Sequence, residues 1–263
     1  MRTIGIASGK GGVGKTTIST NVALALARAN YRVLLVDGDF GLTNIQLSFG
    51  LNAPLNIGHV LSGERSIEEV VSKTKEGLAI IPAASGVGAL AHLSAFQMKL
   101  LVDSVSELNE SYDFVIVDAA AGISHNVITL LTACQETFIV ARDEPSSIAD
   151  GYGIMKVLKK DHGYDAITLI PAAIETPNQG TQLHAKLNAA CQKFLGLDLQ
   201  IAPGIAKDEA ITISAKKYQP VIDAFPTSTV SQNLKTLAKT IAGESRRLHK
   251  HQGPQFFPEK IKF

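Results

Sequence analysis

The 263-residue sequence contains no tryptophan and only two cysteines, and aromatic residues make up 6% of it. Cys134 and Cys191 lie in apolar surroundings and form no C-x-x-C pair, so neither a zinc site nor a disulfide framework is expected. No apolar run reaches the ~18 residues of a membrane-spanning helix. Charges nearly cancel, with 25 basic and 24 acidic residues. The net charge of +1 therefore gives no overall field that would attract nucleic acid or a membrane.

Apolar residues are plentiful by comparison. Hydrophobic residues make up 45% of the chain, which suits a substantial core in one large α/β domain or two small ones. The N-terminus leads directly into an apolar stretch and leaves no room for a signal peptide. A cytoplasmic protein is the expectation.

Short apolar segments rich in β-branched residues alternate with longer helical patterns. The expected strands are 3–7, 33–37, 78–82, 114–118, 137–141 and 166–170. The expected helices are 16–29, 65–74, 95–110, 123–134, 147–160, 181–195 and 228–242. Continuously apolar strands are typical of a parallel sheet buried on both faces. The alternation predicts an α/β fold with a doubly wound, mostly parallel sheet flanked by helices, whose ligands bind at the carboxyl ends of the strands. We expect one domain over 1–243 and a basic C-terminal tail over 244–263.

Residues 9–17 match the pattern G-x-x-x-x-G-K-[ST] of a phosphate-binding loop, between an expected strand and an expected helix. Its glycines let successive backbone N–H groups turn toward phosphate oxygens. Lys15 would reach the β- and γ-phosphates, and the Thr16 hydroxyl would hold Mg²⁺. A glycine-rich turn that binds nothing is less favoured, because every required position is filled. The residues expected to bind nucleotide here are Gly9, Lys10, Gly11, Gly12, Val13, Gly14, Lys15, Thr16 and Thr17.

Two acidic residues lie at the ends of expected strands. Asp39 comes just after the second strand, where a carboxylate would orient an attacking water and contact the water shell of a metal. Asp118 ends the apolar run 114–117, where it would hold Mg²⁺ through water. An Asp-Gly turn and an ordinary strand-ending carboxylate are the simpler interpretations. Together with the loop, these groups favour phosphoryl transfer to water. The candidate catalytic residues are Lys10, Lys15, Asp39 and Asp118, and the candidate metal-binding residues are Thr16, Asp39 and Asp118.

Several segments resemble a known family. Residues 10–17 resemble the deviant Walker A motif of the MinD/ParA ATPases. Residues 37–44 are similar to their switch I, and residues 118–123 to their switch II. The segment 143–158 is most similar to the FlhG (FleN) branch, which controls the number and placement of bacterial flagella. The resemblance spans about residues 1–243.

The resemblance implies a P-loop NTPase of the SIMIBI type that uses ATP/ADP and Mg²⁺ and forms a homodimer when ATP is bound. Lys10 of each subunit would contact ATP held by the other, and Glu144 and Asp150 would lie at cross-dimer contacts, with Glu144 joining the nucleotide-binding set. Hydrolysis would be slow and stimulated by a partner. Protein partners would include a flagellar GTPase, a switch complex or a transcription factor. Members of the family usually read adenine with an Asn after the sixth strand. This chain has Pro171 near that position and Ala206 in a later segment, so the choice of base stays open.

The basic tail raises the possibility of a membrane surface as a partner. Its cationic and apolar residues are Arg246, Arg247, Lys250, Lys260, Lys262, Phe256, Phe257, Ile261 and Phe263. They would suit anionic lipid at the inner face of the cell membrane, although Pro254 and Pro258 interrupt any long helix. A solvated or packed tail is the alternative. Two lysine pairs, 159–160 and 216–217, are more typical of solvated helix faces than of a nucleic-acid surface.

Other functions stay open at this stage. The same kind of switch would serve another cargo, such as the division septum, DNA or a receptor array. A nucleotide-binding scaffold that regulates a transcription factor with negligible turnover is a further alternative. An iron–sulfur carrier is disfavoured, because it needs two suitably placed cysteines in each chain.

Overall fold

The computed structural model describes residues 1–40, 45–84, 93–108, 111–243 and 255–256. Its strands are β1 (Arg2–Ser8), β2 (Val33–Gly38), β3 (Ser72–Lys73), β4 (Ala79–Ile81), β5 (Phe114–Ala121), β6 (Glu136–Ala141), β7 (Ile167–Ile174), β8 (Gln200–Ile201) and β9 (Ile205–Ala206). Its helices are α1 (Lys15–Arg28), α2 (Ile45–Ser48), α3 (Ile57–Leu61), α4 (Ile67–Val70), α5 (Ala95–Ser106), α6 (His125–Thr132), α7 (Pro145–His162), α8 (Pro177–Leu195), α9 (Glu209–Lys216), α10 (Val221–Ala224) and α11 (Thr229–Gly243).

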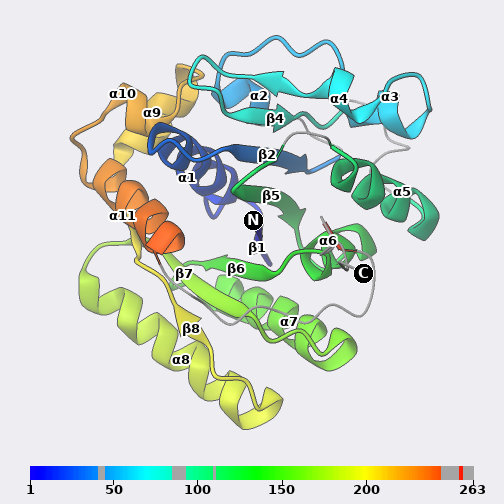
Figure 1. Ribbon diagram of the computed structural model, residues 1–263. Helices are drawn as coiled ribbons and strands as arrows, with labels where there is room; N and C mark the ends of the chain where they lie inside the picture. Colours follow the sequence, from blue (N-terminus) through cyan, green and yellow to red (C-terminus); the bar gives the residue numbers. More distant parts are fainter. Residues whose placement is uncertain (41–44, 85–92, 109–110, 244–254, 257–263) are drawn as a thin grey trace.

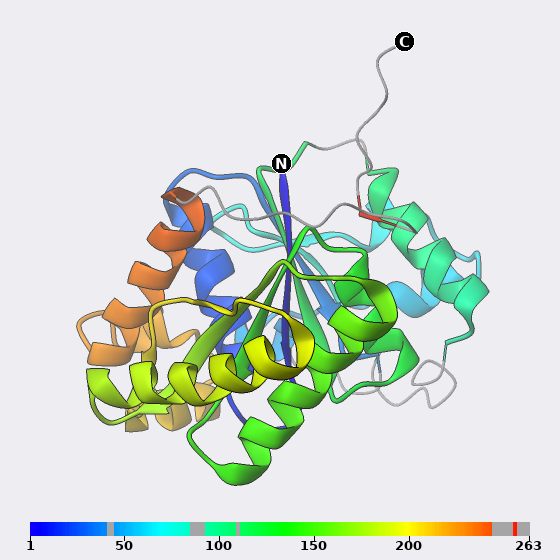
Figure 2. The ribbon, with the colours of Figure 1, turned by 90° about the horizontal axis from the view of Figure 1, so that it is seen from below.

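The strands form one twisted sheet in the order β3-β4-β2-β5-β1-β6-β7-β8, and β9 pairs with β7 (Figure 1). All described pairings are parallel except that of β3 with β4. Helices α1 and α11 lie side by side on one face, and α5, α6 and α7 cover the other (Figure 2). Strands β2 and β6 are buried along their whole length, which explains the apolar runs 33–36 and 138–141 within them. The predicted doubly wound, mostly parallel fold is confirmed.

One predicted helix is wrong. Residues 65–74 form only the single turn of α4, followed by the edge strand β3. The turn starts because Ser66 and Glu69 form a reciprocal capping box. It stops because Val71 is extended, with ψ of 120°, and Ser72 then pairs antiparallel with Ile80 of β4. Val71, a β-branched residue, fits this extended backbone better than a second helical turn.

Two strands run further than predicted, and both extensions lie near the site. Strand β5 does not end at Asp118 but continues to Ala121, because Ala121 pairs with Ser8 across a register shift in β1. Strand β7 continues to Ile174 and pairs there with β9. Five short elements escaped the sequence patterns because each is shorter than the window in which periodicity can be read. They are α2, α3, α10, β8 and β9. Helix α9, of eight residues, was also missed.

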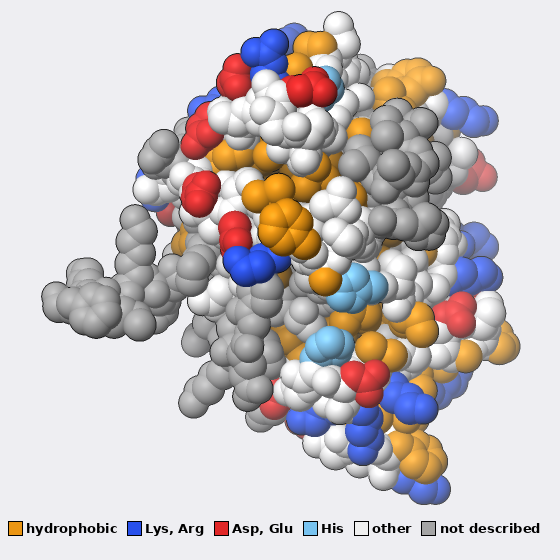
Figure 3. All heavy atoms as spheres, turned by 90° about the vertical axis from the view of Figure 1, so that its right-hand side faces the viewer, with side chains coloured by type: hydrophobic (Ala, Val, Ile, Leu, Met, Phe, Trp, Pro, Cys, Tyr) orange, Lys and Arg blue, Asp and Glu red, His pale blue; other side chains and the backbone are white. Residues whose placement is uncertain are grey.

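The outward side of α5 exposes large apolar side chains. Phe96 is 75% exposed, and Leu100 on the same helix is also exposed. Figure 3 shows hydrophobic side chains gathered on this side of the molecule between charged ones. Exposed apolar side chains that gather in one patch are typical of surfaces that contact another protein. Within the described residues, no helix is long and apolar enough to cross a membrane.

One residue of the basic tail is packed into the core. Phe256 is 2% exposed, and its backbone N–H donates to the carbonyl oxygen of Ala133 at 3.0 Å. The hydroxyl of Ser106 donates to the carbonyl oxygen of Gln255 at 3.4 Å. Phe256, which we expected to be available for lipid, therefore packs against the protein between α5 and the end of α6 in this structure. Residues 244–254 and 257–263, which hold the remaining residues named for the tail, lie outside the described residues.

The buried position of Phe256 predicts a measurable contribution to stability. Phe256→Ala should lower the free energy of unfolding by about 3 kcal/mol, because it empties an apolar site within the core. Urea denaturation of the full chain measures the difference. Phe194→Ala, at a side chain that is 57% exposed, is the matched control and should change stability by less than about 0.5 kcal/mol. Equal effects of the two substitutions would contradict the packing of the tail.

Candidate functional site

The predicted phosphate-binding loop follows β1 at the carboxyl edge of the sheet and leads into α1. Gly12 and Gly14 adopt φ values of 76° and 108°, which favour glycine. Helix α1 begins without a side-chain cap and without an acidic residue in its first turn. Its first backbone N–H groups and the positive end of its dipole therefore face the loop without an anionic partner from the helix itself. This arrangement suits a phosphate group.

Asp118 and Thr16 meet at the base of the loop, although they are 102 positions apart in the chain. The hydroxyl of Thr16 donates to Oδ2 of Asp118 at 2.7 Å. Oδ1 of Asp118 is buried and has no hydrogen-bond partner within the described part of the chain. Burial raises the pKa of the Asp118 carboxyl to about 6, although the hydrogen bond from Thr16 and the charge of Lys15 act to lower it. A buried carboxylate oxygen without a donor, beside a hydroxyl, fits a hard cation such as Mg²⁺.

The raised pKa of Asp118 predicts how metal-assisted nucleotide binding depends on pH. A metal ion needs the ionised carboxylate, so the affinity for ADP with Mg²⁺ should fall by about tenfold for each pH unit below about 6. Calorimetric titration of wild type and Asp118→Asn across this range measures it. The phosphate of ADP titrates in the same pH range. The effect of Asp118 is therefore the difference between the pH profiles of ADP affinity of the two proteins. Parallel pH profiles would contradict a metal-binding role for Asp118.

The same pKa shift gives the stability of the nucleotide-free protein a pH dependence opposite to that of nucleotide binding, because stability increases as the pH falls. The folded-state pKa lies above the ordinary value of 3.8, so the folded protein holds the proton more tightly than the unfolded chain. The contribution of this group to stability is therefore fully present below about pH 4 and is lost as the pH rises through about 6.

Asp37 and Asp39 differ in their surroundings. Asp37 is buried, and its carboxylate accepts hydrogen bonds from the backbone N–H groups of Asp39 (3.2 Å) and Ile45 (3.4 Å). It thereby fixes both ends of the segment after β2, whose residues 41–44 lie outside the described structure. Asp39 is half-buried and lines a cavity of 450 Å³ together with Lys15 and Thr16. The predicted water-orienting carboxylate thus shares one cavity with the lysine and the hydroxyl of the loop.

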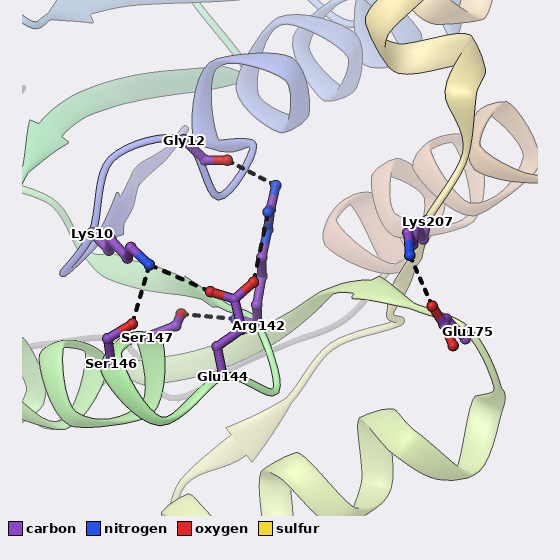
Figure 4. A network of polar contacts seen from close by, with 8 residues as sticks. All are labelled: Lys10, Gly12, Arg142, Glu144, Ser146, Ser147, Glu175 and Lys207. Carbon is purple, nitrogen blue, oxygen red and sulfur yellow. Dashed lines mark hydrogen bonds and ion pairs between the residues drawn. The ribbon is translucent and has the colours of Figure 1, made fainter.

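Helix α7 packs directly against the start of the loop. A Cβ atom on Gly9 would lie 2.3 Å from the backbone carbonyl carbon of Asp150, so a larger residue would push α7 and the loop apart. Nζ of Lys10 lies 3.4 Å from Oε2 of Glu144 and 3.1 Å from the hydroxyl of Ser146 (Figure 4). Lys10 and Glu144 are each almost half exposed. The lysine that we expect to act across a dimer is held here by weak contacts within its own chain.

Arg142, which the sequence analysis missed, also belongs to the site. It follows β6 directly, and its Nη2 donates to the carbonyl oxygen of Gly12 at 2.7 Å (Figure 4). Its backbone N–H donates to the hydroxyl of Ser147 at 2.9 Å. The rule that singled out Asp39 and Asp118, a charged residue directly after an apolar strand, would have found it.

A cavity of 680 Å³ extends from the loop past Arg142 toward the ends of β7 and β9. Its wall includes Lys15 and Thr16 at one end and Ala206 at the other. Its volume suits a nucleotide-sized ligand. Pro171 pairs with Ala141 in the sheet and is not among the described residues of the wall. Glu144 also lines this cavity, so most members of the predicted nucleotide-binding set meet in one place; the roles assigned to them remain predictions.

The sequence and the fold are similar to those of several known proteins, which are related to one another. The sequence model of an AAA domain matches residues 1–162. The chain is 35% identical to the antiactivator FleN of Pseudomonas aeruginosa, covering 99% of this chain and 93% of FleN. It is 31% identical to the flagellum site-determining protein YlxH of Helicobacter pylori, covering 89% and 80% of the two chains. The structure of the septum site-determining protein MinD of Pyrococcus horikoshii, complexed with Mg-ADP, superposes with a TM-score of 0.76 at 26% identity, covering 92% of this chain and 96% of MinD.

Proposed function

Since the chain belongs to the MinD/ParA family of ATP-binding P-loop proteins, in its FlhG/FleN branch, we propose that it is an ATPase switch that controls the number and placement of flagella. In this proposal the protein is a monomer with ADP and a homodimer with ATP and Mg²⁺. Hydrolysis of ATP to ADP and phosphate is slow, and a protein partner accelerates it. The match to FleN over nearly the whole chain favours flagella over other cargo.

The observation that carries the switch is the position of Lys10. Its side chain stands at the outer start of the loop, 45% exposed, and it is held only by the exposed Glu144 and Ser146 among the described residues. A lysine needed solely for its own nucleotide would point into the cavity, as Lys15 does, yet Lys10 is absent from the described wall of either cavity. It is therefore free to exchange a weak contact in its own chain for a phosphate on a second copy.

The other site residues bind phosphate, metal and water within one subunit. Lys15 and the N–H groups at the start of α1 bind phosphate oxygens, and Thr16 and Asp118 hold the metal. A Mg²⁺ ion held by these residues would supply positive charge next to the phosphates. Asp39 orients the attacking water in the cavity that it shares with Lys15. Closure of a second subunit over the site would exclude bulk water and strengthen these interactions.

Partners follow from the same proposal. FleN is named an antiactivator, so a transcription activator is one class of partner, beside a flagellar GTPase or switch complex. The exposed face of α5, with Phe96 at its surface, supplies an apolar area for such a contact. We place the protein in the cytoplasm, with its tail at the inner face of the membrane in part of its cycle. The proposal includes no contact with nucleic acid.

Deletion of the gene in its host, followed by counting flagella in electron micrographs, tests the function. We expect the deletion to change the number or position of flagella. The wild-type gene should restore the normal pattern, whereas the Lys15→Ala variant, which weakens nucleotide binding, should not. Normal flagella with misplaced septa, DNA or receptor arrays would assign another cargo to the same switch. Full restoration by Asp39→Ala would favour the scaffold without turnover.

A further inference from the structure

Arg142 lies where β6 ends and α7 begins, and its side chain crosses to the phosphate-binding loop. One of its five donor N–H groups is used by the bond from Nη2 to Gly12. Nη1 lies 3.9 Å from Oε1 of Glu144, which is an ion pair rather than a hydrogen bond. Asp143, the next residue, pairs instead with Lys186 at 2.8 Å. The guanidinium therefore lies near the loop and is largely without acceptors among the described residues.

The least satisfied atom of this side chain is Nε. It is buried and has no hydrogen-bond partner within the described structure. Leaving a buried donor on a charged group without an acceptor is unfavourable. Because Nε is buried, an anion in the cavity would meet the exposed part of the guanidinium, whose side chain is 35% exposed. Arg142 also lines the 680 Å³ cavity that begins at Lys15. The unused donors and the cavity point to the same kind of ligand.

We propose that Arg142 is a further nucleotide-binding residue, whose guanidinium contacts phosphate oxygens common to ADP and ATP. Arginine suits this task because its planar donors match the geometry of phosphate oxygens. The bond from its backbone N–H to Ser147 fixes the base of the side chain, and the bond to Gly12 holds its tip beside the loop before any ligand arrives (Figure 4). This inference rests on the nucleotide site of the proposed function and adds to it a cation that acts within one subunit.

A second role would explain the contact with Gly12 equally well. Arg142 would then only brace the loop through its hydrogen bond to the carbonyl oxygen, and its charge would not matter. The two roles separate in variants that keep the donor or keep the charge. Arg142→Gln keeps a donor without charge, Arg142→Lys keeps both, and Arg142→Met keeps neither.

The experiment is calorimetric titration of the full chain with Mg-ADP at low and moderate salt. We expect Arg142→Met and Arg142→Gln to weaken ADP binding about 10- to 100-fold and to reduce its salt dependence. Arg142→Lys, which keeps the charge but loses the planar donors, should bind ADP with an affinity between those of wild type and Arg142→Gln. Adenosine should bind all four proteins equally. Arg32→Met is the control, since Arg32 pairs with Asp113 at an exposed position outside the described cavity walls. Thermal unfolding without nucleotide reports whether each variant folds.

Two outcomes would overturn the inference alone. Wild-type affinity of Arg142→Gln combined with weak binding by Arg142→Met would reduce Arg142 to a brace. Wild-type affinity in all three folded variants would remove it from the nucleotide site. A wild-type protein that binds neither Mg-ADP nor Mg-ATP would instead overturn the proposed function, and this inference with it.

Discussion

Lys10→Ala is expected to abolish ATP-driven dimerisation while leaving ADP binding largely intact. Among the described residues of the single chain, Lys10 makes only exposed contacts, 3.4 Å to Glu144 and 3.1 Å to Ser146, which contribute little to stability. In the dimer, each Lys10 would bind a phosphate of the partner's nucleotide, so the substitution removes two contacts at once. Hydrogen bonds to charged groups contribute about 1.5–3 kcal/mol each, and two of them correspond to about a 10²- to 10⁴-fold change in dimer affinity.

Light scattering coupled to size exclusion, with a non-hydrolysable ATP analogue, measures this effect. Lys99→Ala is the matched control, because Lys99 is an exposed lysine that pairs with Asp103 on the same helix. Lys15→Ala should lose affinity for ADP as well as ATP-driven dimerisation, which distinguishes it from Lys10→Ala. Dimerisation of Lys10→Ala at the wild-type concentration of analogue would show that the lysine does not act across the dimer.

Asp39→Ala is expected to lower phosphate release by at least about a hundredfold while ATP binding and dimerisation persist. A carboxylate that positions the attacking water contributes about 10²- to 10⁴-fold to such a reaction. Asp39 suits that role because it shares the 450 Å³ cavity with Lys15 and Thr16, whereas Asp37 is committed to backbone N–H groups. Since nucleotide contacts remain, the dimer of the variant should persist longer than that of wild type.

Steady-state phosphate release and the lifetime of the dimer after dilution measure the two effects. Asp161→Ala, at an exposed residue near the end of α7, is the control and should behave as wild type. Unchanged phosphate release in Asp39→Ala would move the water-orienting role to another residue. Negligible release by wild type itself would favour the scaffold.

The sheet was predictable because its strands are buried on both faces. Such strands are rich in apolar residues, and β2 and β6 were read correctly from the apolar runs that they contain. The edge strand β3 has no such requirement. Its pairing with β4 is decided by the tertiary structure, so residues 65–74 looked helical in sequence.

The site was predictable to the extent that it lies at strand ends. The loop motif supplied Thr16 and the strand-end rule supplied Asp118, which are 102 positions apart. The structure places the Thr16 hydroxyl 2.7 Å from the Asp118 carboxylate. The strand-end rule was applied to acidic residues only, so Arg142 was missed, and its reach to Gly12 across 130 positions depends on side-chain geometry. The burial of Phe256 was equally unreadable, because a proline-containing tail has no periodicity to indicate which residue packs.

The sequence also could not say which copy of the chain Lys10 contacts. Its resemblance to the MinD/ParA loop implied a contact across the dimer, and the single chain places it on Glu144 and Ser146. The contact within the chain and the proposed contact across the dimer fit a two-state switch. When the triphosphate is bound, Lys10 would leave Glu144 and Ser146 and bind a phosphate on the second copy.

Sedimentation velocity of the wild-type protein with Mg²⁺ and a non-hydrolysable ATP analogue, compared with Mg-ADP, tests the switch most directly. We predict a species of twice the monomer's mass with the analogue and the monomer alone with ADP. A monomer under both conditions, at concentrations where binding of the analogue is saturated, would contradict a switch that works by pairing two copies of the chain.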